Sequence, residues 1–425
     1  MRRASPWLAA AALFAATAIV RAGPDDPATQ ATPAITSGET RGLWVLRTSL
    51  TTEAHIRAMV RSAEAGGFNT LLVQVRGRGE ALYRSAIEPR ASELDGQPAE
   101  FDPLAVTIEA AHRAGLQVHA WINVDLVAGG TTLPRSREHI VSRHPDWLMV
   151  PRELAMTELE TDVHSPAYLG QLMRWTRAAG TRVEGLYLSP IPPDAQAYTA
   201  SVAHELVARY PLDGVHLDYA RYPDDGFDYS RSALAAFRAN RLAATSVADR
   251  QRLDQHAASD PLIWTKTFPQ GWIAFRRERL TALVSRIVLD ARATRPGLIV
   301  SAAVSPRAEE ARVERLQDWA LWASSGTLDV VCPMAYATDL PSFTAQVTSA
   351  RASAGRVPVW AGIGAYLLPV ADASEHVRAA RKAGAAGVLV FSYDSLMTRD
   401  AGDSSYFAGL RPALLESPSG AGAGR

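Results

Sequence analysis

The chain of 425 residues has very little cysteine, almost no lysine and no excess of either charge. Cys332 is the only cysteine, which excludes an internal disulfide and a metal site built from several thiolates. Its neighbours are apolar, so we expect a buried small side chain there. Lysine and arginine number 44 and are balanced by 44 acidic residues. No global charge therefore favours nucleic acid as a partner.

Long apolar runs are also scarce, and the one near the N-terminus is too short for an ordinary membrane span. Arg2 and Arg3 precede this run, and the small residue Ala22 fits a cleavage position. We expect residues 1–22 to be a cleavable signal peptide, with an uncleaved anchor as the alternative, and no membrane span in the mature protein. Export without disulfides favours the periplasm or secretion.

The flanks of the remaining chain have linker-like composition. Residues 23–40 are rich in Pro, Thr and Ala and are expected to form a flexible linker. Residues 415–425 are rich in Ser, Gly and Ala and are expected to be a disordered tail. The segment 41–414 between them is the predicted folded domain.

That domain alternates helical patterns with short stretches rich in Val, Ile and Leu. Alternation of this kind predicts a parallel sheet covered by helices, and eight units predict a (β/α)8 TIM barrel. The expected strands are 41–46, 70–76, 117–124, 214–219, 299–305, 330–336, 359–363 and 387–393. Residues 125–212 and 224–298 are long insertions after the third and fourth strands, and the extended piece 185–190 is assigned to the first of them.

The fourth predicted strand ends in a carboxylate. Polar and apolar residues alternate in 213–223, which places His216 and Asp218 on one face near the C-terminal end. Barrel enzymes carry their chemistry at that end, so Asp218 is the main catalytic candidate, as nucleophile or base. A structural ion pair with Arg76 or Arg221 is one alternative. A metal site is another, but the other strand ends supply few further histidines, and no metal or cofactor is expected.

The second predicted strand leads into the glycine-rich stretch 74–80. Strand parity places Gln74 and Arg76 on one face, and we expect Arg76 to pair with Asp218. Glu80 is the first choice for the second catalytic carboxyl group, in the role of the acid. The alternative is that Glu80 is only a solvated acid in a loop. The rival partners are Asp339, Glu309 and Glu310.

Polar and aromatic side chains are predicted to gather near the C-terminal strand ends. Aromatic faces stack on sugar rings, and charged groups bind sugar hydroxyls. The predicted substrate-binding residues are Arg76, Arg78, Trp121, Asn123, His216, Tyr219, Arg221, Tyr222, Tyr336, Trp360 and Tyr393. No Gly-x-Ser-x-Gly motif supports a serine hydrolase.

Several motifs together resemble the bacterial glycosyl-hydrolase-like family 10, whose members are (β/α)8 glycosidase-like proteins of the cell envelope. The motifs are Arg41–Trp44, Val73–Arg76, Gly79–Tyr83, His119–Asn123, His144–Trp147, Asp213–Pro223 and Pro333–Tyr336. The resemblance implies hydrolysis of glycan chains, with peptidoglycan glycan strands as the substrate class. The chain departs from the family at Glu80, commonly Asp, and at Met334, often Gln. Ala220 replaces the glutamate that a chitinase-type mechanism needs.

The sequence therefore predicts an exported glycoside hydrolase that acts on a cell-wall or related polysaccharide through paired carboxyl groups. A non-catalytic glycan-binding barrel and, third, a metal-dependent hydrolase are the alternatives. Retention and inversion both stay open, because the separation of the two carboxyl groups decides between them.

Overall fold

The computed structural model describes residues 38–399 and 405–416. The predicted signal peptide lies outside these ranges, as do most of the predicted linker and tail. In the described ranges, no helix has both the length and the apolar character that a membrane crossing requires.

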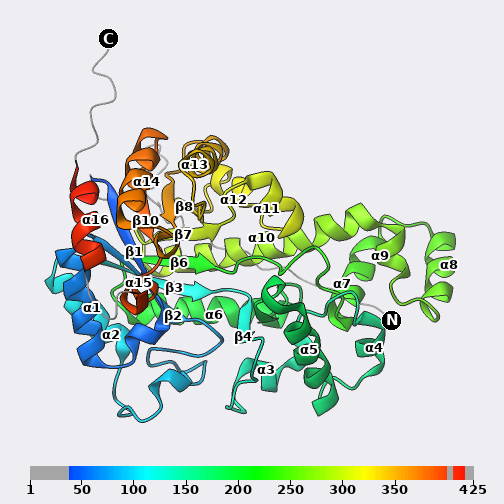
Figure 1. Ribbon diagram of the computed structural model, residues 1–425. Coiled ribbons are helices and arrows are strands. Elements are labelled where there is room, and N and C mark those ends of the chain that lie inside the picture. The colour runs from blue at the N-terminus through cyan, green and yellow to red at the C-terminus, as the bar shows by residue number, and fades with distance from the viewer. Residues whose placement is uncertain (1–37, 400–404, 417–425) are drawn as a thin grey trace, which may run out of the picture. The chain divides into compact units, whose positions relative to one another are not determined.

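Eight parallel strands form the core of the fold (Figure 1). Their order in the sheet is β8-β7-β6-β3-β2-β1-β10-β9, and parallel bridges from Val331 to Val359 and from Met334 to Gly362 join the two outer strands. The strands are β1 (Thr40–Val45), β2 (Thr70–Arg76), β3 (Gln117–Asn123), β6 (Gly214–Asp218), β7 (Ile299–Val304), β8 (Val330–Pro333), β9 (Trp360–Ile363) and β10 (Gly387–Val390). The predicted (β/α)8 barrel is confirmed.

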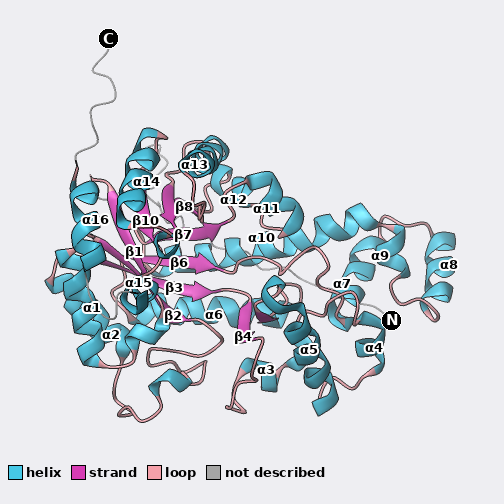
Figure 2. Ribbon diagram, in the orientation of Figure 1, coloured by secondary structure: helices cyan, strands magenta, loops and turns pink. Residues whose placement is uncertain are grey.

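Helices cover the outside of this barrel (Figure 2). In α1 (Glu53–Ala65) the buried residues Ile56, Met59, Val60 and Ala63 recur at helical spacing, so one face packs on the sheet. The hydroxyl oxygen of Thr52 accepts the backbone N–H of His55 and caps this helix. The covering helices are α1 (Glu53–Ala65), α2 (Pro103–Arg113), α6 (Pro193–Arg209), α10 (Pro269–Thr294), α11 (Ala308–Glu314), α12 (Trp319–Ser324), α13 (Leu340–Ala354), α14 (Val370–Lys382), α15 (Tyr393–Arg399) and α16 (Ser405–Leu415).

Two long connections build additional structure beyond the C-terminal strand ends, on the right in Figure 1. The connection from β3 to β6 holds β4 (Leu126–Gly129), α3 (Ile140–Arg143), α4 (Ala155–Glu160), α5 (Pro166–Ala179) and β5 (Gly185–Tyr187) before α6. The connection from β6 to β7 holds α7 (Arg231–Leu242), α8 (Val247–Ala257) and α9 (Ile263–Thr267) before α10. Strands β4 and β5 pair antiparallel in a sheet of their own, so β5 is not a barrel strand.

Interlocking side chains fill the inside of the barrel. The buried cluster there consists of Trp44, Leu72, Trp121, Ile299, Val330, Cys332, Trp360 and Leu389. Gly42 has no side chain because a Cβ atom at that position would lie 2.2 Å from Cδ2 of Leu389. Cys332 is fully buried, as predicted. An interior packed in this way leaves room for a site only above it, at the C-terminal ends of the strands.

Candidate active site

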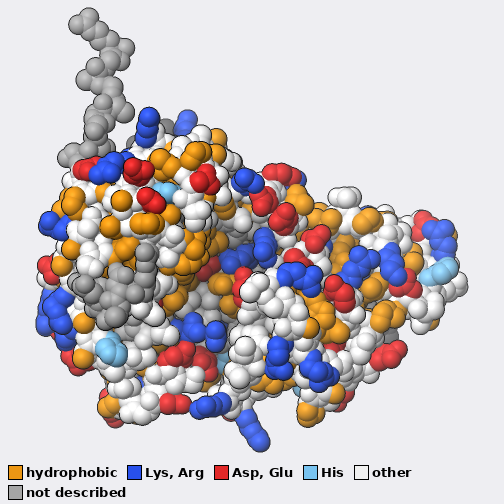
Figure 3. All heavy atoms as spheres, viewed as in Figure 1, with side chains coloured by type: hydrophobic (Ala, Val, Ile, Leu, Met, Phe, Trp, Pro, Cys, Tyr) orange, Lys and Arg blue, Asp and Glu red, His pale blue; other side chains and the backbone are white. Residues whose placement is uncertain are grey.

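A cavity of about 370 Å³ opens above the packed interior. Its lining comes mainly from the last inward-facing residue of each strand and from the loops that follow. The lining residues are Trp44, Leu46, Arg47, Gln74, Gly77, Arg78, Trp121, Asn123, Leu126, Glu184, Asp218, Tyr219, Arg221, Ala303, Met334, Tyr336, Tyr366 and Phe391. Figure 3 shows a hollow in the middle of the view, where β3 and β6 end in Figure 1.

Asp218, the last residue of β6, lies in this cavity and is only 6% exposed. Its Oδ1 atom accepts the backbone N–H of Tyr219 at 2.6 Å and a guanidinium N–H of Arg221 at 3.0 Å. Burial raises the pKa of Asp218, the two hydrogen-bonded donors oppose that rise, and the charge of Glu184 adds to it. Asp218 is therefore a carboxyl group whose protonated form is accessible closer to neutral pH than for an exposed aspartate.

Glu184 is the other carboxylate that lines the cavity. It precedes β5 in the first insertion, and its Oε2 atom accepts the hydroxyl of Tyr187 at 2.6 Å. Its Oε1 atom lies 3.9 Å from Nη2 of Arg221, whose Nη1 atom contacts Asp218. One guanidinium thus contacts both carboxylates, so these lie within roughly 10 Å of each other, the range of paired-carboxylate glycosidases.

The loop after β6 shapes this arrangement through Tyr219. Its φ angle of 49° lies in the left-handed region, which is uncommon for a residue with a side chain and costs on the order of 1–2 kcal/mol. The turn brings the guanidinium of Arg221 over the Tyr219 ring, 4.0 Å from its centroid. Both residues, which the sequence analysis proposed as substrate-binding, line the cavity with Asp218.

Aromatic rings form much of the rest of the cavity wall. Phe391 lies 6.0 Å from Trp44, 6.5 Å from Trp121, 5.5 Å from Tyr336 and 5.9 Å from Tyr366, measured between ring centroids. Such a wall offers flat faces for a sugar ring.

The predicted residue Asn123 completes this region and is held by its neighbours. Its Oδ1 atom accepts the indole N–H of Trp121 at 2.9 Å, and its amide donates to the carbonyl of Gly77 at 2.7 Å. Asn123 therefore fixes the Trp121 ring and the loop after β2 against each other.

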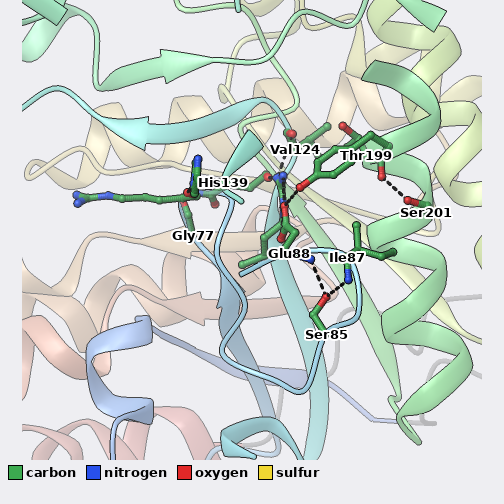
Figure 4. A network of polar contacts seen from close by, with 12 residues as sticks. Gly77, Ser85, Ile87, Glu88, Val124, His139, Thr199 and Ser201 are labelled. Carbon is green, nitrogen blue, oxygen red and sulfur yellow. Dashed lines mark hydrogen bonds and ion pairs between the residues drawn. The ribbon is translucent and has the colours of Figure 1, made fainter. Parts of the chain in front are cut away.

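The predicted pair of Arg76 with Asp218 is wrong, and Arg76 does not line the cavity. Arg76 is 1% exposed and forms an ion pair with Glu88, with Nη2 2.7 Å from Oε1. Its Nη1 atom donates to the carbonyls of Asn123 and Val124, and Tyr198 donates to Glu88 at 3.0 Å. Figure 4 shows this network, which fastens the ends of β2 and β3 to the loop around Glu88 and to α6.

A bulge in β2 explains why strand parity failed for Arg76. Gln74 pairs with Trp121 and Arg76 with Ile122, so two steps along β2 correspond to one step along β3. An extra residue of this kind moves every later side chain to the opposite face. Gln74 therefore faces the cavity, whereas Arg76 shares the outward face of Ile122.

Glu80 lies in a neighbouring cavity and not in the one that holds Asp218. Burial and the charge of Glu93 raise the pKa of Glu80. The rival acids do not line the Asp218 cavity either. Asp339 is the N-cap of α13, and Glu309 and Glu310 form ion pairs with arginines along α11.

Four other predicted substrate-binding residues are buried away from the cavity. His216 is fully buried beneath it, between Trp44 and Ser301. Trp360 is the first residue of β9 and lies in the barrel interior rather than at a C-terminal strand end. Tyr222 is fully buried and donates to the carbonyl of Arg276, and Tyr393 stacks on Phe407 of α16. The predicted residues that do line the cavity are Arg78, Trp121, Asn123, Asp218, Tyr219, Arg221 and Tyr336.

Sequence reasoning missed Glu184. The available signal was the pair Glu184-Gly185 before an extended apolar piece, which repeats the pattern of Asp213-Gly214 before β6. Trp44, Arg47 and Leu126 were also missed as lining residues, although Trp44 ends the motif Arg41–Trp44.

Comparison with known proteins identifies the family. The model of the family described as Glycosyl hydrolase-like 10 matches residues 39–374. Glycosyl hydrolase DigH of Escherichia coli (strain K12) is 32% identical over 157 residues, which are 36% of this chain and 30% of DigH. Glycosyl hydrolase YngK of Bacillus subtilis (strain 168) is 24% identical over 290 residues, which are 64% of this chain and 46% of YngK. The matches thus span less than half the length of these relatives.

Solved structures share the barrel. The glycoside hydrolase domain of PgaB (BpsB) from Bordetella bronchiseptica aligns with a TM-score of 0.61 at 16% identity, over 89% of this chain and 100% of that domain. Alpha-L-fucosidase isoenzyme 2 from Paenibacillus thiaminolyticus aligns with a TM-score of 0.58 at 18% identity, over 88% of this chain and 49% of the fucosidase. At these identities the likeness concerns the fold alone.

Proposed function

Because the chain belongs to the glycosyl hydrolase-like 10 family, we propose that it is an exported glycoside hydrolase of bacterial cell-wall glycan. Asp218 and Glu184 supply its two carboxyl groups. The observation that carries this proposal is the position of both carboxylates in one cavity, on the same guanidinium of Arg221.

The two carboxyl groups differ in environment, and this difference assigns their roles. Asp218 is buried and has a raised pKa, so it is suited to hold the proton that the leaving glycosidic oxygen needs. Glu184 is 34% exposed, so it is suited to act as the ionised partner. This assignment reverses the order expected from the sequence, where Asp218 was the nucleophile or base.

In the reaction, the proton of Asp218 passes to the glycosidic oxygen as the bond from that oxygen to the anomeric carbon breaks. Glu184 acts on the opposite side of the sugar, either by taking a proton from the attacking water or by bonding to the anomeric carbon itself. In the second case, a water that gives its proton to the ionised Asp218 attacks that carbon, and the bond to Glu184 breaks. Arg221 stabilises whichever carboxylate is ionised at each stage.

The surroundings support a saccharide substrate. The aromatic wall offers stacking faces, and Gln74 and Arg78 add polar groups that bind hydroxyls. The family resemblance supports a cell-wall glycan, and the predicted signal peptide supports export to the compartment where that glycan lies. Export is tested by sequencing the N-terminus of the protein recovered from the periplasm or medium, which we expect to begin after Ala22.

Incubation with defined glycans tests the activity. We expect the full chain to release soluble fragments from peptide-stripped peptidoglycan strands, and the Asp218→Asn and Glu184→Gln variants to lose at least about 1,000-fold in kcat. Glu310→Gln is the matched control, because this acid is exposed and pairs with Arg307, the N-cap of α11. A parent protein that binds these strands without cleaving them would establish the glycan-binding alternative.

Substrates with good leaving groups test the roles. A leaving group such as dinitrophenolate needs no protonation, so Asp218→Asn should recover most of its rate on an activated aryl glycoside while Glu184→Gln does not. Recovery by Glu184→Gln alone would exchange the two roles.

A further inference from the structure

A second cavity, of about 540 Å³, adjoins the candidate active site. The two cavities share one lining residue, Arg78. The second is lined by Arg78, Glu80, Ser92, Glu93, Asp95, Gly129, Thr132, Leu133, Pro134 and Arg135. These residues come from the loop after β2, from the end of β4 and from the loop that follows β4. The cavity therefore extends the site away from the barrel axis.

The guanidinium of Arg78 lies at the junction, over Gly129. A Cβ atom at Gly129 would lie 3.1 Å from Cζ of Arg78, so the absence of a side chain there makes room for the guanidinium. The backbone of Arg78 is fixed, because its carbonyl contacts Nε2 of His139 at 2.8 Å. Within the described ranges, no carboxylate forms an ion pair with Arg78. Its side chain is exposed and lines both cavities.

The acids of the second cavity also keep free acceptors. Glu93 accepts the Arg47 guanidinium on Oε1 at 2.6 Å, whereas its buried Oε2 atom has no hydrogen-bond partner among the described residues. Glu80 is half-buried and has a hydrogen bond with the backbone of Ser92, but it forms no ion pair within the described ranges. Asp95, at the rim, lies 3.6 Å from Arg135.

Unpaired donors and acceptors around a polar cavity, with a small apolar rim, match the surface of a sugar. Carboxylates and guanidinium groups bind vicinal hydroxyls through paired hydrogen bonds. Leu133, which is 40% exposed, and Pro134 offer an apolar patch for the C–H face of a ring. The mixture of charges suits a neutral hydroxyl-rich ligand better than an ion of either sign.

We propose that the second cavity is a further sugar-binding subsite, in which Glu80 and Glu93 bind hydroxyls of a glycan residue beyond the one at Asp218, with Arg78 contacting the chain between them. Glu80 is then a specificity residue, not the catalytic acid. The proposal rests on the proposed glycan-cleaving function, and it adds that the substrate is a chain long enough to occupy both cavities.

The dependence of cleavage on chain length tests this subsite. For a series of oligosaccharides cut from peptide-stripped strands, we expect kcat/KM of the parent to rise by about 10-fold or more once the chain reaches the second cavity. That gain should be lost in Glu80→Gln, and also in Thr132→Trp, which fills the cavity without changing its charges. Glu310→Gln should keep it.

Binding to the inactive Asp218→Asn variant separates the two proposals. If this variant binds long oligosaccharides more tightly than short ones, and adding Glu80→Gln removes the difference, the subsite is supported. This holds even where the parent shows no cleavage. Equal kcat/KM and equal affinity across all lengths, or a length-dependent gain that survives both Glu80→Gln and Thr132→Trp, would overturn the subsite while leaving the catalytic proposal intact.

Discussion

Acid should destabilise the folded protein through His216, which lies beneath the active-site cavity. Its Nε2 atom accepts the indole N–H of Trp44 at 3.1 Å, so the proton resides on Nδ1 and is directed to the hydroxyl of Ser301 at 2.9 Å. Burial lowers the pKa of His216 to about 3, because the charged ring would lose its water, and repulsion from His119 lowers it further.

The size and sign of the effect follow from the two pKa values. The unfolded chain takes up a proton near pH 6.5, whereas the folded chain does so only near pH 3, so stability falls as the pH drops between these values. From pH 7 to pH 5 this single group removes about 2 kcal/mol. His119, whose pKa is lowered to about 4 by burial, acts in the same direction.

Urea unfolding of the parent and of His216→Gln at pH 7 and pH 5 isolates this contribution from other titrating groups. At pH 7 the variant should be less stable, because it loses the two hydrogen bonds and the ring packing. At pH 5 that deficit should shrink by about 2 kcal/mol, because only the parent then loses stability through position 216. His204→Gln, at an exposed position on α6, is the control. A deficit that is equal at both pH values would refute the assignment of a neutral buried ring.

Other predictions concern packing and charge. Arg76→Met or Glu88→Gln should each lower stability by about 3–5 kcal/mol, measured by urea unfolding, because each leaves one buried charge unpaired; the double variant should lose less than the sum. Gly214→Ala should lower the melting temperature, since its Cβ would lie 2.4 Å from Nδ1 of His119, and an unchanged value would contradict that packing. Arg221→Met should raise the pKa of the proton donor and move the basic limb of the kcat profile to higher pH; a shift of the acidic limb instead would make that group the base.

The barrel was predictable because its signals are local. Each strand carries a run of Val, Ile and Leu bounded by turns, and eight such runs alternate with helical patterns. The alternation of side chains along a strand also put Trp121, Asn123 and Asp218 on the inward face, where the structure has them. It did so because β3 and β6 pair without a register shift.

The partners of the catalytic candidate were not predictable in the same way. The bulge before Arg76 has no clear signal in the sequence, and it reversed the direction of that side chain. Glu184 reaches the cavity only because β5 folds back on β4, a contact between segments about 60 residues apart along the chain. Tyr222, Trp360 and Tyr393 have suitable chemistry but point into packed regions, which depends on tertiary structure.

The rate of glycan cleavage by single and double variants tests the paired carboxyl groups most directly. On peptide-stripped peptidoglycan strands, Asp218→Asn and Glu184→Gln should each lower kcat by at least about 1,000-fold, and the double variant should be no slower than the slower single variant, because the two groups act as one unit. Parent-like cleavage by either single variant, with the folded state intact, would contradict the account.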